Sequence, residues 1–224
     1  MFNSVKVIGA GRVGSAVGAR LAERGIALRE EAELVLVCVP DGAIAKVAAS
    51  IARGPWVAHV SGATPLSALD PHERRFSVHP LQTFTRARGP EQLDGAWAAV
   101  TAETGEARAR GFWLAETLGL RPFPLADERR VLYHAGAVFA SPYLVALHAA
   151  AARLLREAGA PQEALEPLMR RTMENGFELT GPIARGDWTT VAAHLQAIRA
   201  AAPELEPLYC ALADATEAIA RRQR

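Results

Sequence analysis

Near its N-terminus the chain reads Val5-Lys6-Val7-Ile8-Gly9-Ala10-Gly11-Arg12-Val13-Gly14. A short β-branched run leads into a G-x-G-x-x-G loop, and helical spacing follows from Arg12 to about Arg24. In such a strand–loop–helix unit the first glycine makes the turn, the second lets a pyrophosphate approach the backbone, and the third lets helix and sheet pack together. The helix N-terminus adds positive potential. We therefore expect the six residues from Gly9 to Gly14 to bind a dinucleotide; the alternative is a tight turn with a structural role only.

Apolar runs and helical stretches alternate after this loop. Strands are predicted at Leu34–Val39, Trp56–Val60, Phe76–Val78 and Trp97–Thr101, and helices from Asp41 to Ile51 and from Glu106 to Leu118. Such alternation predicts a mostly parallel sheet with helices on its faces. From about Ala126 onward the sequence shows only alanine-rich helical stretches. The prediction is an α/β, Rossmann-like domain at residues 1–125, followed by an all-α substrate and dimerisation domain at residues 126–224.

The second strand of the predicted dinucleotide fold is truncated. Only Ile26 to Glu33 separates Gly25 from the next apolar run. That length allows a strand stub at residues 26–28, but a crossover helix needs at least ~10–12 residues. Glu30 and Glu31 lie near the position where an acidic residue binds the adenine ribose, and Arg29 is placed to meet a 2′-phosphate. A solvated charged turn explains the same residues, so both alternatives stay open.

Composition excludes several classes of protein. The 224 residues carry 25 Lys and Arg against 24 Asp and Glu, a net charge of +1, so no global field favours nucleic acid. The two cysteines, Cys38 and Cys210, are too few for a disulfide framework, which indicates a reduced, cytoplasmic protein. No metal site is expected, because the six histidines form no i, i+4 pair. We also expect no membrane-spanning helix, since no apolar run approaches ~18 residues.

Further motifs identify a family resemblance. They follow in the order Val39-Pro40-Asp41, Ser61-Gly62-Ala63, Val78-His79-Pro80-Leu81-Gln82-Thr83-Phe84, Tyr133-His134-Ala135 and Thr180-Gly181-Pro182-Ile183-Ala184-Arg185-Gly186-Asp187. Over nearly its whole length the chain resembles a bacterial family that joins a Rossmann-like NADP-binding domain to a helical domain of unknown function. That family is similar in architecture to pyrroline-5-carboxylate reductases, prephenate dehydrogenases and β-hydroxyacid dehydrogenases.

The resemblance implies NADP as cofactor, with NAD as the alternative. The side chain of Asp41 is expected to cap the helix that follows it. The resemblance also implies that the backbone around Val39, Pro40 and Asp41 faces the nicotinamide ribose. The sequence departs from the family at the truncated second strand and at Ser141-Pro142, where the long helix of the family has Ser-Asn. Proline removes a backbone donor and is expected to kink that helix.

Four residues are candidates for the chemistry. His79 follows a predicted strand at the end where open α/β sheets bind ligands, so its imidazole is placed to act as acid or base. Ser61 should project into the same crevice. His134 and Ser141 are seven residues apart on one helix face, ~10.5 Å along the axis. Strand capping, a Ser-Gly turn and a polar stripe at the domain junction are the corresponding structural alternatives.

Three further side chains are candidates for binding the substrate. Gln82 and Thr83 are polar groups on the loop after His79. Arg185 is the fixed charge in its loop that is able to hold a carboxylate bidentately, although a structural salt bridge is the alternative. Asp187 is expected to cap the helix that follows.

Together these features predict an NAD(P)-dependent oxidoreductase acting on a small, carboxylate-bearing metabolite in a cleft between the two domains. The alternative is a non-catalytic homodimer, a dinucleotide sensor or scaffold that has lost part of its adenosine site. In either case we expect a homodimer built through the helical domain, because about 100 residues are few for an independent core.

Overall fold

The computed structural model describes residues 1–223, and the chain divides into two compact units. The first runs from Met1 to Ser141 and the second from Pro142 to Arg224. The sequence boundary expected near residue 126 marks the end of the β-structure. The compact units divide later because the first helix after the sheet packs on the sheet through Arg130, which is fully buried.

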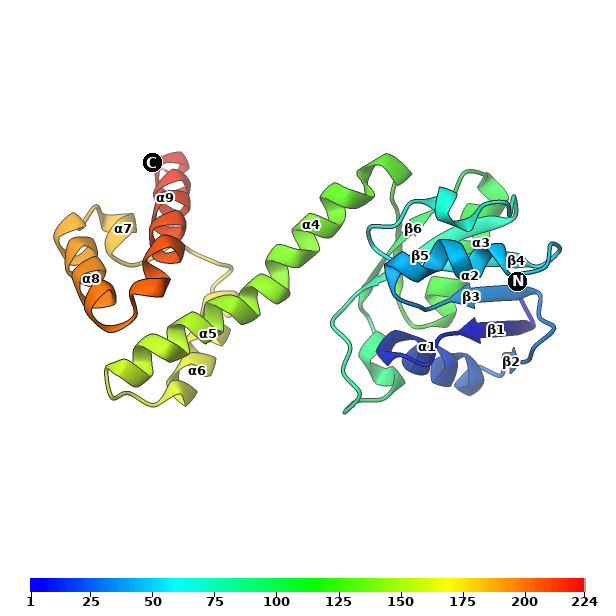
Figure 1. Cartoon of the computed structure of the whole chain (residues 1–224), viewed down its shortest axis with the longest axis horizontal. Helices are drawn as coiled ribbons and strands as arrows, with labels where there is room; N and C mark the ends of the chain where they lie inside the picture. Colours follow the sequence, from blue (N-terminus) through cyan, green and yellow to red (C-terminus); the bar gives the residue numbers. More distant parts are fainter. Residues whose placement is uncertain (224) are drawn as a thin grey trace. The chain divides into compact units, whose positions relative to one another are not determined.

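The first unit is built on a seven-stranded sheet in the order β2-β1-β3-β4-β5-β6-β7 (Figure 1). Neighbouring strands run parallel except β5 and β6, which are antiparallel. The mostly parallel sheet predicted from the sequence is therefore confirmed. The strands are β1 (Ser4–Ile8), β2 (Ala27–Leu28), β3 (Leu34–Val37), β4 (Trp56–His59), β5 (Arg75–Leu81), β6 (Trp97–Thr101) and β7 (Arg121–Pro124).

Helices pack on the faces of the sheet. Because successive side chains of a strand point to opposite faces, the buried apolar residues form two clusters. One buried cluster joins Val5 and Leu36 of the strands to Val17 and Leu114 of the helices. A second, smaller cluster forms around Val57. The helices of the first unit are α1 (Arg12–Glu23), α2 (Ile44–Ala49), α3 (Gly105–Thr117) and α4 (Arg130–Ala140), joined by short 3₁₀ turns.

No helix separates β2 from β3, as the short spacing predicts. Residues 29–33 instead cross the sheet face beside β1. Lys6 is 2.6 Å from the carboxylate of Glu30, and the Glu33 backbone donates to Ser4 Oγ at 3.1 Å. The side chains of Ser4 and Lys6, which β1 presents to this polar loop, are themselves polar. A hollow of about 910 Å³ remains on the same face, lined in part by Val35 and Trp56.

The second unit is wholly helical and has a small core. Its helices are α5 (Pro142–Glu157), α6 (Leu165–Glu174), α7 (Pro182–Arg185), α8 (Trp188–Ala201) and α9 (Glu206–Arg222). Its buried apolar residues are Ala152, Leu165, Val191, Ile198, Ala202 and Ala220. Four of these six are no larger than valine, so the unit by itself buries little apolar surface.

Pro142 breaks the long helix as expected. Ser141 has φ −124° and ψ −81°, which is not helical, and it separates α4 from α5. Proline has no N–H for the carbonyl of Val138 and disfavours helical geometry in the residue before it.

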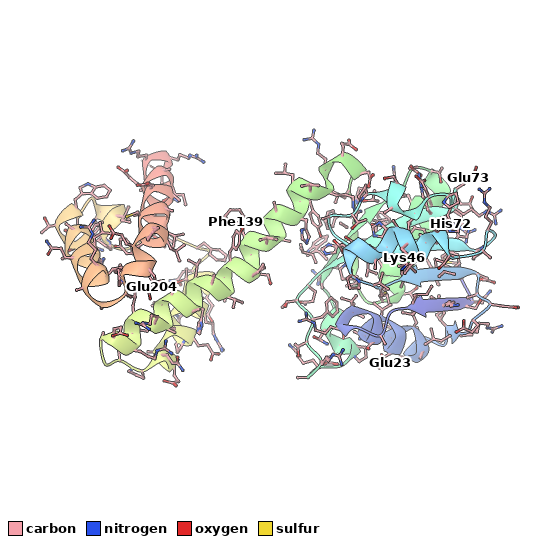
Figure 2. The ribbon with its side chains drawn as sticks, in the orientation of Figure 1. Glu23, Lys46, His72, Glu73, Phe139 and Glu204 are labelled. Carbon is pink, nitrogen blue, oxygen red and sulfur yellow. The ribbon has the colours of Figure 1, made fainter. Side chains whose placement is uncertain are left out.

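The expectation that no apolar stretch is long enough to span a membrane is wrong. The helical segment Asp127–Glu157 is long and apolar enough to do so by length and composition. The run from residue 131 to residue 152 contains no Asp, Glu, Lys or Arg, although Pro142 breaks the helix within it. Most of this run is exposed, including Val131, Phe139 and Val145, and Figure 2 shows Phe139 projecting outward from α4.

Candidate functional site

The glycine loop is fixed by two close backbone contacts. Gly9 has φ +115°, and a Cβ there would lie 2.4 Å from the carbonyl oxygen of Cys38. A Cβ on Gly14 would lie 1.9 Å from the carbonyl oxygen of Gly9. Only glycine fits at both positions, which hold the loop against the end of β3 beside Val39.

Gly11 is glycine for a different reason. Its φ of −74° is open to any residue, and a Cβ there would meet no atom within 4 Å. The loop therefore leaves free space on the side of Gly11, at the point where α1 begins. This is the side from which a pyrophosphate approaches in a dinucleotide-binding loop.

The N-terminus of α1 is also electrostatically prepared for an anion. No side chain caps it, and its first turn contains no acidic residue. In α3, by contrast, Thr104 accepts a hydrogen bond from the backbone of Ala107, and Glu106 lies in the first turn. The free N–H groups and the helix dipole at Gly11 thus fit the phosphates of a dinucleotide.

The other loop residues have supporting contacts. Arg12 donates to the carbonyl of Phe84 at 3.5 Å, which ties the glycine loop to the loop after β5. Val13 packs against the core cluster. The carbonyl of Ala10 accepts from the Ser15 hydroxyl at 3.3 Å.

A polar bridge joins the ends of β3 and β4. Ser61 Oγ lies 2.8 Å from Asp41 Oδ2 and 2.9 Å from Thr64 Oγ1, and it accepts from the Thr64 backbone at 3.0 Å. The Ser61 hydroxyl is therefore engaged within the protein, and it positions Asp41, which follows Val39 and Pro40 at the end of β3. Asp41 was expected to cap the helix that follows, but its carboxylate bonds to Ser61 and no side chain caps that turn.

His79 lies inside a strand rather than after one. β5 extends to Leu81, beyond the predicted end at Val78, because β6 pairs with it in antiparallel register, with His79 opposite Ala99. On its other side β4 ends at His59, opposite Ser77. His79 therefore projects from the part of β5 that passes the carboxyl end of the parallel strands.

Three aromatic side chains meet at this edge. Nδ1 of His79 lies 2.8 Å from the hydroxyl of Tyr133, and the ring centroids of His79 and His134 are 6.0 Å apart. Both imidazoles close over Gly62: a Cβ there would lie 2.6 Å from Cδ2 of His134 and 2.8 Å from Nε2 of His79. The Ser-Gly turn thus places a glycine where a larger residue would displace both rings.

The electrostatics keep His79 and Tyr133 uncharged. Burial, with smaller contributions from His134 and Arg130, lowers the pKa of His79 to about 4. Burial raises the pKa of Tyr133 to about 12. At neutral pH the pair is therefore a neutral imidazole bonded to a neutral phenol.

Arg130 anchors α4 to the sheet, and sequence reasoning missed it. Its guanidinium is fully buried and donates to Ser77 Oγ and Thr101 Oγ1, each at 2.7 Å, and to the carbonyl of Ser61. The nearest carboxylate is that of Asp127, 3.9 Å from Nε. The signal available in the sequence was helical spacing, since positions 130, 133 and 134 share one helix face.

The remaining predicted residues do not join the cluster through any contact between described residues. Gln82 and Thr83 are exposed, and the Gln82 amide donates to the carbonyl of Gln92 at 3.2 Å. Ser141 lies at the helix break. Arg185 is exposed in the second unit, where Asp187 accepts from the Thr190 backbone at 3.1 Å and caps α8 as expected.

Residues 1–223 contain no group of three or more His, Cys, Asp or Glu side chains that could hold a metal ion.

Solved structures share this fold. A provisionally assigned NADP oxidoreductase from Bacteroides fragilis is 24% identical with a TM-score of 0.81, covering 96% of this chain and 98% of that one. A Thermotoga maritima protein is 23% identical with a TM-score of 0.79, covering 98% and 99%. An NADH-preferring ketol-acid reductoisomerase from an uncultured archaeon is 16% identical with a TM-score of 0.65, covering 96% and 82%. These neighbours show that the chain has a Rossmann-like fold followed by a helical domain.

At the sequence level, no curated protein matches the chain significantly. The profile of one family, described as a domain of unknown function, DUF2520, matches residues 96–216, more than half of the chain. The match begins at β6 and extends into α9, so it includes Arg130, Tyr133 and His134. The chain therefore belongs to the DUF2520 family.

Proposed function

We propose that the protein is an NAD(P)-dependent oxidoreductase that acts on a small, carboxylate-bearing metabolite. The observation that carries the proposal is the open side of Gly11 at the uncapped N-terminus of α1. Nicotinamide-dependent oxidoreductases among the neighbours of the same fold, including an NADPH-bound reductive aminase from Aspergillus terreus, support it.

In this proposal the backbone of Gly9 to Gly14 holds the cofactor phosphates, and the backbone from Val39 to Asp41 meets the nicotinamide ribose. The bound cofactor would supply or accept the hydride. His79 would exchange a proton with the oxygen or nitrogen bonded to the reacting carbon, a role for which its place at the carboxyl end of the parallel strands suits it. His134 would orient the substrate, and Ser61 would hold Asp41 in place.

NADP is the proposed cofactor. The carboxylate of Glu30 is 2.6 Å from the ammonium of Lys6, so it is engaged within the protein. Arg29, directly after β2, is exposed and follows the strand whose end faces the adenine ribose in this fold. A guanidinium at this position favours a 2′-phosphate.

The carboxylate of the substrate is assigned to Arg185. The buried Arg130 is unsuitable, because its terminal nitrogens donate to Ser77, Thr101 and Ser61. Arg185 is exposed, and no carboxylate of residues 1–223 lies within 4 Å of it. Ser141, Gln82 and Thr83 are proposed as the other polar residues that bind the substrate.

A second candidate function is a dinucleotide sensor without catalysis. The two-residue β2 and the missing crossover helix favour it, because they reduce the surface available to the adenosine half of a cofactor.

Titration of the purified protein with NADPH and NADH tests the proposal. We expect saturable binding of NADPH, weaker binding of NADH, and loss of both in a Gly11→Val variant. Absence of saturable binding of either at millimolar concentration would contradict the proposal. Tight binding without hydride transfer to any of a panel of small keto acids and imines would favour the sensor.

We also propose a homodimer formed through the helical surfaces. Exposed apolar side chains run along α4 and α5, while the core of the second unit is small. A second copy would bury that surface, and small alanine-rich faces let helices approach closely.

A further inference from the structure

We propose that Tyr133 is a positioning residue that sets the tautomer of His79, donating its hydroxyl proton to Nδ1 so that Nε2 carries the ring proton. The importance of that proton for catalysis rests on the proposed function. The tautomer itself is a property of the free protein.

The contact admits two proton arrangements. The Tyr133 oxygen lies 2.8 Å from Nδ1, and the rings meet edge to face with centroids 5.5 Å apart. Either Tyr133 donates to a bare Nδ1, or a protonated Nδ1 donates to the phenol oxygen.

Acid–base strength favours the first arrangement. The bare nitrogen of imidazole is a base with an ordinary pKa of about 6.5, whereas a phenol oxygen is hardly basic. Phenol, with an ordinary pKa of about 10, is in turn the stronger proton donor. The better donor therefore faces the better acceptor when Tyr133 donates.

The surroundings leave Nε2 as the functional atom. Across residues 1–223 the hydrogen bonds give Nε2 of His79 no partner, and it faces Gly62 opposite the ring of His134. The charged and titratable groups around His79 are His134, Arg130, Asp41 and His59, besides Tyr133 itself. An Nε2–H at this place is able to donate a hydrogen bond to a carbonyl oxygen or an imine nitrogen of a substrate. When that proton is transferred to the reduced substrate, Nδ1 takes the proton of Tyr133, so the imidazole stays neutral and the phenol is left as phenolate.

The helix makes the contact rigid. Arg130 lies one turn before Tyr133 on α4 and is fixed to β5 and β6 through Ser77 and Thr101. Tyr133 and His79 are therefore held to the same two strands, so the phenol stays within reach of Nδ1.

The chain offers a matched control in the second unit. Nδ1 of His194 lies 2.8 Å from the hydroxyl of Tyr209, with ring centroids 6.1 Å apart and planes at 89°. This pair has the same chemistry and the same contact distance, but it contains no proposed site residue.

The test is nitrogen-15 NMR of the full-length protein labelled at histidine, without cofactor, with His79 assigned by its loss in His79→Gln. We expect an unprotonated, hydrogen-bonded Nδ1 and a protonated Nε2 in the wild type. In Tyr133→Phe we expect both tautomers, whereas Tyr209→Phe should change only His194. The ratio of the two tautomers should change roughly five- to tenfold in Tyr133→Phe, the change that loss of one ordinary hydrogen bond allows. Turnover should fall in proportion to the lost share of the Nε2–H tautomer, with unchanged cofactor affinity.

A protonated Nδ1 in the wild type would overturn the proposal, and so would an unchanged His79 tautomer in folded Tyr133→Phe. If that variant does not fold, the wild-type spectrum still decides which nitrogen is protonated, and Tyr133→Leu, which also lacks a donor, replaces it. Failure of cofactor binding would contradict the proposed function and leave the tautomer result standing, so the two failures are distinguishable.

Discussion

A Cβ atom on Gly14 would lie 1.9 Å from the carbonyl oxygen of Gly9, while a Cβ on Gly11, three residues earlier, would meet nothing within 4 Å. The three glycines of one motif therefore have different physical roles. Gly9 and Gly14 are required by the fold, and Gly11 keeps space free for a ligand.

This difference predicts that Gly11→Val abolishes dinucleotide binding and leaves the protein folded, whereas Gly14→Ala lowers the free energy of unfolding by about 1–3 kcal/mol or more through overpacking. Calorimetric titration with NADPH and urea denaturation measure the two effects. Gly105→Val is the control for a valine at an unobstructed helix start, since a Cβ at Gly105 also meets nothing within 4 Å. Undiminished affinity in Gly11→Val would show that the loop is only a turn.

For a substrate that the enzyme turns over, His79→Ala should lower turnover by roughly 10²–10⁴-fold, the usual contribution of a positioned acid or base. Its cofactor affinity should stay near that of the wild type, because the glycine loop holds the phosphates. His72 is a structural control: its Nε2 lies 3.0 Å from the carbonyl of Ala48, so His72→Ala should lower stability and leave turnover intact. Near-normal turnover in His79→Ala would assign His79 a structural role.

The stability of the fold should fall as the pH decreases below about 6.5. Burial lowers the pKa of His79 to about 4 and that of His59 to about 3. In the unfolded chain both would titrate near 6.5, so between these values the unfolded state binds more protons. Urea denaturation from pH 7.5 to pH 4.5 should show this loss, with a shallower pH dependence in His79→Gln. An identical slope in that variant would contradict a neutral His79.

Arg130→Met should lower the free energy of unfolding by about 2 kcal/mol or more. The variant leaves the Ser61 carbonyl and the hydroxyls of Ser77 and Thr101 buried without their donor, and each such group typically costs about 1–3 kcal/mol. Arg129→Met, at an exposed neighbouring position, is the matched control in the same denaturation series. A more stable Arg130→Met would mean that burying the guanidinium costs more than its hydrogen bonds return.

Light scattering should report a particle of twice 23.9 kDa at micromolar concentration. Val145→Glu, on the exposed apolar surface of α5, should shift the protein toward the monomer. Leu28→Glu, at an exposed apolar position of β2, should not. A wild-type monomer would refute the dimer. Sedimentation of that monomer with phospholipid vesicles would identify a membrane as the partner of the apolar helix instead.

The fold was largely predictable because its signals are local. The β-branched run before Gly9, the glycine spacing and the short interval from Ile26 to Glu33 each determine structure within a few residues. The end of β5 was not predictable in this way, since His79 is in a strand only because β6 pairs with it.

The candidate site was predictable in part. His79 and His134 stood out by residue type and position, but Tyr133 and Arg130 acquire their roles from partners more than 50 residues away along the chain. Such contacts leave little trace in a single sequence. The apolar segment around Pro142 was not predicted to be long enough to span a membrane. Here a local signal outweighed a longer one, because the proline marks a helix break although the residues on both sides of it are uncharged.

The two edges of the sheet restrict how the protein is able to aggregate. β2 offers only two residues of free edge. In β7 the backbone of Arg121 donates to Ala96 and that of Leu125 to Val100, so by alternation the outward positions are Pro122 and Pro124, which have no N–H to offer. A foreign strand would find few donors at either edge, a common protection against amyloid-like strand addition. The edges of the sheet therefore offer a second copy few groups to pair with, and two copies are expected to associate through other surfaces.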